Sequence, residues 1–222
     1  IGRVTAQIAR VLWLGHASSQ DFCCDEETKL MPDGLGPAAL ETLTAALGQH
    51  GWIDGASDDA APYLTDWSQA YTGTAIGVAR PSSVEEVQAV MRWAAAEGVA
   101  VVPQGGHTGL VGGGTPFSNG RKVVLSLKRM NQVRKIDPAN YTMIAEAGVI
   151  LQDAQKAALD ADRFFPLSLG AEGSCTVGGN ISTNAGGVNV IRYGNARALV
   201  LGLEVVLPDG EIWNGLRTLR KD

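Results

Sequence analysis

Residues 102–114 read Val102-Pro103-Gln104-Gly105-Gly106-His107-Thr108-Gly109-Leu110-Val111-Gly112-Gly113-Gly114. The apolar run at residues 99–102, ahead of the glycines, is typical of a buried strand. A strand that runs into glycines leaves backbone N–H groups free and lets a ligand come close to the main chain. Loops of this kind commonly bind phosphate, so residues 103–114, the first glycine loop, predict a site for a phosphate-bearing ligand.

Two common phosphate-binding motifs do not fit the first glycine loop. A Walker loop requires a lysine after its last glycine, whereas Thr115 and Pro116 follow Gly114. A dinucleotide fingerprint must open a helix, but residues 115–120 are turn-like and residues 122–127 predict another strand. The loop therefore joins strand to strand, and taken alone it is also compatible with a flexible surface loop.

A second glycine-rich segment favours a ligand-binding loop over a flexible surface loop. Residues 173–187, the second glycine loop, read Gly173-Ser174-Cys175-Thr176-Val177-Gly178-Gly179-Asn180-Ile181-Ser182-Thr183-Asn184-Ala185-Gly186-Gly187. Neither loop contains an acidic residue, a lysine or an arginine, whereas solvated linkers usually carry charge. The pair predicts a large, mostly neutral ligand held by backbone N–H groups and small polar side chains.

The two loops together resemble a known family. Residues 103–113 are similar to the pyrophosphate loop of the vanillyl-alcohol-oxidase, or PCMH, type of FAD-binding domain. Residues 167–174, 178–180, 183–187 and 192–194 resemble its D-2-hydroxyacid dehydrogenase branch, which includes D-2-hydroxyglutarate dehydrogenase, flavin D-lactate dehydrogenase and the FAD subunit of glycolate oxidase. The resemblance covers about residues 60–222. It implies an α+β fold with a small parallel βαβ subdomain, an incomplete antiparallel sheet with helices, and FAD between them.

The resemblance also implies the cofactor-binding residues. These are Pro103, Gln104, Gly105, Gly106, His107, Thr108, Gly109, Leu110, Pro166, Gly170, Ser174, Gly178, Gly179, Asn180, Thr183 and Asn184. Non-covalent FAD is implied, because the branch holds its flavin without a bond to the protein. A histidine in this loop bonds covalently to the flavin in some distant relatives, so a covalent link at His107 remains an alternative. No catalytic residue and no metal ligand is expected here, and Asp58, Asp59 and Asp66 are interpreted as a solvated face.

The reaction implied is FAD-dependent oxidation of a D-2-hydroxy acid, with a hydride passing from substrate C2 to flavin N5 to give the 2-oxo acid. The implied electron acceptor is an electron-transfer flavoprotein or a quinone. A homodimer is a possible assembly of the full-length protein. The substrate domain of the family, with its carboxylate-binding, metal and catalytic residues, is expected beyond Asp222. A catalytically silent, truncated flavin-binding module is therefore the alternative, whereas residues 183–187 argue against a carbohydrate or aldonolactone oxidase.

Composition excludes some other classes. The formal charge is −5 with the basic residues scattered, which argues against a nucleic-acid partner. Cys23, Cys24 and Cys175 are not spaced as a zinc motif or a disulfide framework, which favours free thiols in a reducing compartment. We expect a cytoplasmic protein, with a peripheral membrane association as the alternative, because no apolar run approaches the roughly 20 residues of a membrane span.

The chain divides into three predicted parts. Residues 1–36 are expected to be an extra tail, although helical spacing of apolar residues and the absence of acids among the first 20 also have the character of a transit peptide. Residues 37–72 predict a helical lead-in that starts at Pro37 and ends near Gly51. Its Tyr63, Trp67 and Tyr71 are expected to pack onto residues 73–222, the FAD-binding domain.

Within residues 73–222 the pattern predicts strand, helix and strand. The strand at residues 76–79 is followed by a capping box of Ser82 and Glu85, a helix from residue 84, and Gly98 as its end. The second strand ends at Val102 and residues 122–127 add a third, which places the first glycine loop at the carboxyl edge of a parallel sheet. A strand at 142–148, a helix at 152–161 and a hairpin around residues 208–210 are expected later.

Overall fold

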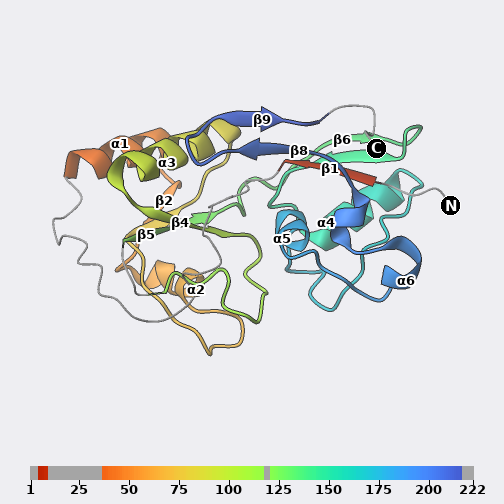
Figure 1. Ribbon diagram of the computed structural model, residues 1–222, viewed down its shortest axis with the longest axis horizontal. Coiled ribbons are helices and arrows are strands. Elements are labelled where there is room, and N and C mark those ends of the chain that lie inside the picture. Colours follow the sequence, from red (N-terminus) through yellow and green to blue (C-terminus); the bar gives the residue numbers. More distant parts are fainter. Residues whose placement is uncertain (1–4, 10–36, 118–120, 217–222) are drawn as a thin grey trace, which may run out of the picture.

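The protein is described from a computed structural model that covers residues 5–9, 37–117 and 121–216. Two lobes lie side by side, each built on one sheet (Figure 1). The first lobe has four strands in the order β2-β3-β5-β4, and the second has five in the order β6-β7-β1-β8-β9. Helices and strands are mixed in both lobes, which confirms the α+β class.

The first sheet combines β2 (Trp52–Asp54), β3 (Gly77–Ala79), β4 (Ala100–Gln104) and β5 (Lys122–Ser126). The central strand β5 is parallel to β3 on one side and to β4 on the other, whereas β2 adds to β3 in the antiparallel sense. The predicted strand–helix–strand unit is present, and β5 inserts between its two strands. The first glycine loop leaves the carboxyl end of β4, as predicted.

Helices cover both faces of this sheet. Alternate residues of β5 point to opposite faces, so Val123 and Leu125 contact α3 (Val84–Glu97) and α1 (Pro37–Leu47). Val124 points the other way, toward the short helices η1 (Asp58–Ala60) and α2 (Ala61–Leu64). The expected lead-in is therefore built into this lobe: it contributes α1, on α3, and the edge strand β2, which the sequence did not predict.

The start of α3 lies one residue later than the predicted capping box. Ser83, not Ser82, is the N-cap residue, and its hydroxyl accepts from the Glu86 backbone N–H at 3.2 Å. The Glu86 carboxylate in turn accepts from the Ser82 backbone N–H at 2.7 Å. Glu85 therefore does not close the box. The helix ends at Gly98 in the left-handed conformation, as predicted.

The second sheet contains two antiparallel pairs. One is β6 (Val133–Asp137) with β7 (Thr142–Ala145), and the other is the predicted hairpin of β8 (Val200–Val206) and β9 (Ile212–Asn214). Between them lies β1 (Thr5–Ala9), parallel to both β7 and β8. The expected helical spacing in this part of the N-terminal region is thus wrong for residues 5–9, which form a strand. Residues 1–4 and 10–36 lie outside the described part of the chain.

The core of the second lobe lies between this sheet and two helices. Met143 and Ala145 of β7 contact α4 (Leu151–Asp160) and α5 (Val177–Ser182), largely through Leu151 and Ile181. The segment that follows α5 carries α6 (Val190–Tyr193) and the short helix η2 (Ala196–Leu199) before it enters β8. None of the helices in the described ranges has the length and hydropathy needed to span a bilayer.

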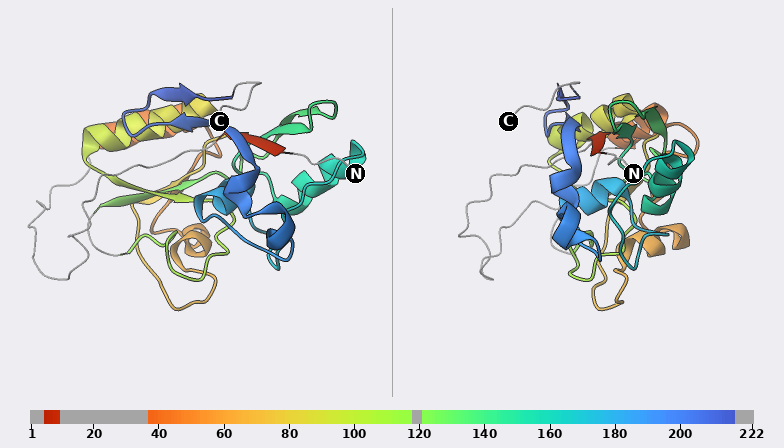
Figure 2. Two further views of the ribbon diagram at one scale, coloured as in Figure 1. Left: turned by 45° about the vertical axis from the view of Figure 1, so that its right-hand side comes forward. Right: turned by 90° about the vertical axis from the view of Figure 1, so that its right-hand side faces the viewer.

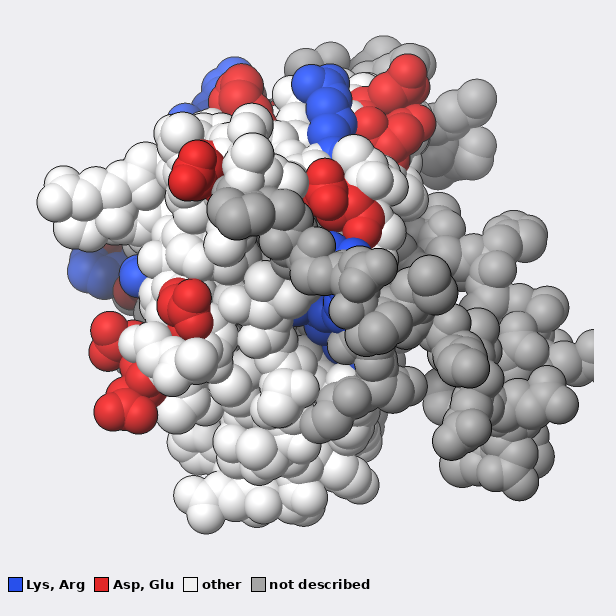
Figure 3. Space-filling model, turned by 90° about the vertical axis from the view of Figure 1, so that its left-hand side faces the viewer, with Lys and Arg blue, Asp and Glu red and all other residues white. Residues whose placement is uncertain are grey.

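The two lobes join along one side. The β8–β9 hairpin of the second lobe extends over α3 of the first in all views (Figures 1 and 2). Gln88 of α3 donates from Nε2 to the Gly210 carbonyl at the hairpin turn, at 2.6 Å. On the face shown in Figure 3, the described basic side chains are scattered among acidic ones.

Candidate flavin site

The first glycine loop is closed by a single side chain. Gln104, at the end of β4, is buried, and its Nε2 donates to the Gly114 carbonyl at the far end of the loop and to the Tyr63 carbonyl, each at 2.6 Å. The bond to Gly114 holds the two ends of the loop together, and the bond to Tyr63 ties the start of the loop to α2. The Gln104 Oε1 is buried and has no protein partner.

The second glycine loop lies directly against the first. A β-carbon on Gly105 would stand 2.1 Å from the Thr176 hydroxyl oxygen, and one on Gly106 would stand 2.1 Å from the Ser174 carbonyl oxygen. Such distances are too short for any side chain, so these glycines allow the two backbones to meet. The need for glycine at position 106 therefore comes from the facing loop, and its φ is not in the left-handed region.

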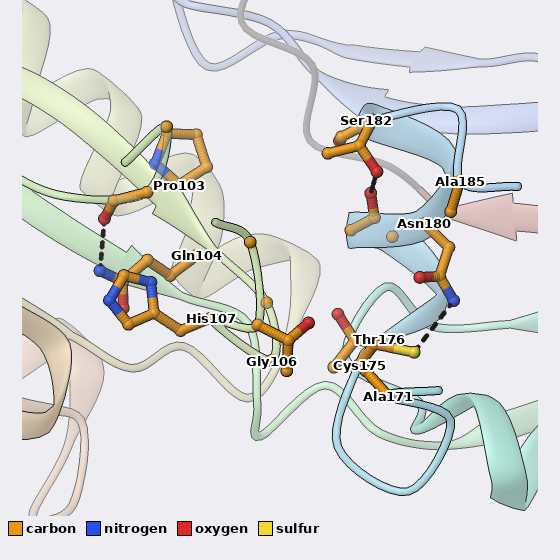
Figure 4. A pocket seen from close by; sticks show the side chains of 18 of the residues that line it. Pro103, Gln104, Gly106, His107, Ala171, Cys175, Thr176, Asn180, Ser182 and Ala185 are labelled. Atoms are coloured by element: carbon orange, nitrogen blue, oxygen red, sulfur yellow. Dashed lines mark hydrogen bonds between the residues drawn. The ribbon is translucent and has the colours of Figure 1, made fainter. Parts of the chain in front are cut away.

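A cavity of about 500 Å³ lies where the two loops meet, at the junction of the lobes. Figure 4 shows Gln104, Gly106 and His107 on one side and Thr176, Cys175 and Asn180 on the other. Most of the predicted cofactor-binding residues line this cavity: Pro103, Gln104, Gly105, Gly106, His107, Thr108, Gly109, Leu110, Gly178, Gly179, Asn180 and Thr183. The volume is in the range of small-molecule and cofactor sites.

Four predicted residues are not among those that line the cavity. Pro166 is buried and its carbonyl accepts from Asn189, and Gly170 is exposed. Ser174 turns its hydroxyl toward the Ala171 carbonyl at 3.4 Å. Asn184 has a φ of 52° and accepts from the Arg197 backbone N–H through its side chain. Pro166, Ser174 and Asn184 make hydrogen bonds within the second lobe, and contact of all four residues with a cofactor stays a prediction.

Several lining residues were not predicted from the sequence. They include Asp66, Leu127, Ala147, Leu169, Cys175, Thr176 and Ser182. Thr176 matters most, because its side chain is 2% exposed and its hydroxyl has no hydrogen-bond partner in the protein. The sequence signal was present, since Thr176 directly precedes the Val177-Gly178-Gly179 segment. Leu127 and Ala147 follow strands of different lobes, and only the fold brings them together.

Asp66 is the one acidic side chain among the described residues that line the cavity, and none of those residues is Lys or Arg. The expectation that Asp66 lies on a solvated face is wrong, because it is 3% exposed. Its carboxylate accepts from the Ser68 hydroxyl and from the backbone N–H groups of Ser68 and Tyr71. These bonds, that from the Ser68 hydroxyl foremost, lower the pKa of Asp66, so the carboxylate is ionised and already partnered.

Two further side chains in the cavity wall, those of Cys175 and His107, belong to reactive residue types. Burial raises the pKa of the Cys175 thiol, and its sulfur accepts from Asn180 Nδ2 at 3.5 Å, so this thiol is protonated and inert at neutral pH. The His107 imidazole turns from the first glycine loop toward the first lobe, where Nε2 donates to the Thr65 carbonyl at 2.8 Å. Among the described residues, no group of three or more histidine, cysteine or carboxylate side chains is placed to hold a metal ion.

The cavity wall fits a phosphate-bearing, largely neutral ligand. Gly109 and Gly113 have open space where a β-carbon would stand, so a ligand can approach the backbone there. The Gln104 amide oxygen and the Thr176 hydroxyl are buried polar atoms that lack partners, and such groups are costly unless a ligand or water completes them. With no described cation in the wall, phosphate charge has to be met by backbone N–H groups.

Comparison of the sequence with known proteins identifies the family to which the chain belongs. Residues 75–215 match the profile of a family described as FAD binding domain. The chain belongs to that family. The chain is 44% identical over 167 residues to a D-2-hydroxyglutarate–pyruvate transhydrogenase of Saccharomyces cerevisiae, across 75% of this chain and 33% of that protein. It is 47% identical over 154 residues to a D-2-hydroxyglutarate dehydrogenase of Xanthomonas citri, across 69% of this chain and 32% of that protein.

Solved structures support the fold of the FAD-binding domain. An alkyldihydroxyacetonephosphate synthase aligns with a TM-score of 0.67 at 22% identity, across 75% of this chain and 32% of that one. The 6-hydroxy-D-nicotine oxidase of Arthrobacter nicotinovorans aligns with a TM-score of 0.65 at 22% identity, across 75% of this chain and 36% of that one. The PCMH-type fold expected from the two loops is thereby confirmed. The chain spans about a third of the length of these curated relatives.

Proposed function

We propose that this chain is the FAD-binding part of a FAD-dependent dehydrogenase that oxidises a D-2-hydroxy acid, such as D-2-hydroxyglutarate or D-lactate, to the 2-oxo acid. One observation carries the proposal: two uncharged glycine loops enclose a cavity at the junction of two lobes, in a chain whose relatives are named D-2-hydroxyglutarate dehydrogenases. A relative named as a D-lactate dehydrogenase, from Schizosaccharomyces pombe, is 38% identical.

Different residues of the chain would bind different parts of the cofactor. The backbone of the first glycine loop faces the pyrophosphate, and Gln104 keeps that loop closed. The Thr176 hydroxyl and the Gln104 amide oxygen supply polar partners from opposite walls. Bound FAD provides the hydride acceptor for the reaction. We propose that it is held without a covalent bond, which agrees with the orientation of the His107 imidazole.

The remaining assignments belong to the proposal as well. We assign residues 1–36 to an N-terminal extension, 37–72 to a lead-in and 73–222 to the FAD-binding domain. The proposed electron acceptor is an electron-transfer flavoprotein or a quinone, the full-length protein is proposed as a homodimer, and the proposed compartment is the cytoplasm. Several relatives are named as mitochondrial, so a mitochondrial location is the competing assignment.

A catalytically silent flavin-binding module is the second candidate. It is favoured by the cavity wall, where the described residues supply no cation for a substrate carboxylate and no unpartnered base. Hydride transfer requires the hydroxy acid to be oriented and its hydroxyl proton to be accepted. We therefore expect this chain alone not to turn over 2-hydroxy acids.

A chimera separates the two candidates. Residues 75–215 would replace the matching segment of the Saccharomyces relative, and flavin content and dye reduction with D-2-hydroxyglutarate and D-lactate would be measured. Retained flavin with turnover on the order of 10 per second supports the dehydrogenase assignment. Retained flavin without turnover favours the silent module, and loss of flavin from a folded chimera contradicts both. The same chimera carrying Gly106→Val serves as the flavin-free control.

A further inference from the structure

Residues 63–74, the flanking segment, contact the start of the first glycine loop at one place and the residues that follow the loop at two. The Tyr63 carbonyl accepts from Gln104, and the Thr74 backbone N–H donates to the Pro116 carbonyl at 2.9 Å. Between these points, the Tyr71 ring meets Phe117 edge-on, with centroids 5.8 Å apart. The flanking segment is thus the outer support of the loop that faces the cofactor.

The flanking segment folds back on itself and brings Asp66 into the cavity wall. Thr65 bridges Thr72, and the Gly73 backbone N–H donates to the Leu64 carbonyl at 2.9 Å. The Asp66 carboxylate closes the turn from inside through its bonds with Ser68 and Tyr71. Any shift of this segment relative to the first glycine loop therefore changes the shape of the cavity.

A second side chain, besides Gln104, joins the two segments next to the cavity. His107 has a φ of 58°, a left-handed conformation that is uncommon for residues other than glycine, although histidine adopts it more often than most side chains do. Its Nε2 donates to the Thr65 carbonyl at 2.8 Å, and its other nitrogen faces the backbone of Gly114, where a β-carbon would be 3.0 Å away. The imidazole is thus held between the flanking segment and the end of its own loop.

We propose that His107 is a positioning residue, which fastens the flanking segment to the first glycine loop and so fixes the cavity wall that carries Asp66. Among the side chains of residues 105–114, only the His107 imidazole makes a hydrogen bond to the described flanking segment, at the Thr65 carbonyl. The inference concerns the ligand-free chain, so it stands or falls independently of the hydroxyacid reaction.

Three substitutions separate the side-chain bond from the backbone conformation. In His107→Gln the amide nitrogen reaches about as far as Nε2, so the donor to Thr65 is kept. His107→Asn keeps a residue type that, like histidine, tolerates the left-handed backbone, but its amide stops at the position of Nδ1 and cannot reach Thr65. His107→Ala removes the donor altogether. The exposed residue His50, at the end of α1, provides the matched control His50→Ala.

Hydrogen exchange of the ligand-free 222-residue chain tests the proposal. In His107→Ala and His107→Asn, the amides of Asp66, Gly73 and Thr74 should exchange about fivefold faster than in the wild type, the effect of one lost hydrogen bond. His107→Gln and His50→Ala should match the wild type, and the amides of β5 should stay protected in every variant.

Two results would overturn the proposal. One is wild-type protection of residues 66–74 in His107→Asn, which would show that the backbone conformation matters and the imidazole bond does not. The other is equal loss of protection in His107→Gln and His107→Asn, which would show that the donor position is irrelevant. The comparison of these two variants decides the question even where His107→Ala does not fold.

Discussion

Gly106 of the first glycine loop and Ser174 of the second lie so close that a β-carbon on Gly106 would stand 2.1 Å from the Ser174 carbonyl oxygen. The same β-carbon would be 2.9 Å from Cys175 Cα. Both neighbours are backbone atoms, which cannot rotate away as a side chain can. The two halves of the flavin site are therefore in direct main-chain contact at this point.

Gly106→Val should separate the two loops and abolish flavin binding. The clash is with backbone, so we expect a loss of about 3 kcal/mol or more in the free energy of unfolding of the ligand-free chain. Gly109→Ala is the matched control for stability, because nothing lies within 4 Å of its β-carbon position, and its effect on the free energy of unfolding should stay within about 0.5 kcal/mol. Urea unfolding compares the stabilities of the two variants, and flavin content after gel filtration compares Gly106→Val with the wild type; a yellow Gly106→Val protein would contradict this placement of the loops.

Bound FAD should leave the protein with acid or denaturant. The His107 Nε2 is already bonded to the Thr65 carbonyl, so the imidazole is not directed at a flavin methyl group. Mass spectrometry of the denatured, flavin-loaded chain should give the mass of the unmodified polypeptide. A flavin adduct on the peptide that contains His107 would show that the imidazole reorients to form a covalent bond.

Thr176→Val should weaken FAD binding without destabilising the ligand-free chain. The Thr176 hydroxyl is buried without a partner, and removal of such a group is neutral or stabilising in the absence of ligand. Loss of one hydrogen bond to the cofactor should raise the dissociation constant about fivefold. Ser126→Ala is the control, because its hydroxyl is also buried and unpartnered but does not line the cavity. Equal FAD affinities of the two variants would remove Thr176 from the site.

Asp66→Asn should destabilise the flanking segment at neutral pH but have little effect in acid. The hydrogen bond from the Ser68 hydroxyl and those from backbone N–H groups lower the pKa of Asp66 in the folded chain. A lowered folded-state pKa means that this stability is present above the unfolded pKa of about 4 and is lost as the pH falls through the folded value. Thermal unfolding at pH 7 and pH 3 should show a difference between wild type and variant that shrinks in acid. A difference of constant size would assign the effect to packing.

Much of the first lobe follows from local sequence signals. Gly98 can end a helix, residues 122–127 can form only a buried strand, and the loop between strands has to emerge at the carboxyl edge of a parallel sheet. Local signals could not predict that β5 inserts between β3 and β4, because strand order depends on which strand edges pair in the folded chain. The strand β1 was missed because the apolar residues around it have helical spacing, and β2 was missed because its three residues directly follow Gly51, which was interpreted as the end of a helical segment.

The site was predictable where it is built of glycine and less so elsewhere. Gly105 and Gly106 were identified because no other residue type permits such close backbone approach. Asp66 was not, because its burial depends on bonds from Ser68 and Tyr71 in a turn with no strong signature. Trp67 was expected to pack onto the domain but is 68% exposed at the tip of that turn, whereas Tyr71 does pack, against Phe117.

The position of β5 has a consequence for how the protein is made. Both neighbours of β5 precede it in the chain, and the first glycine loop is the connection that delivers it to its place between them. Until that connection has left the ribosome, β3 and β4 have apolar faces and unpaired edges with a missing strand between them. The loop that lines the cavity is thus also the link through which the last-synthesised strand of this sheet reaches its place between β3 and β4.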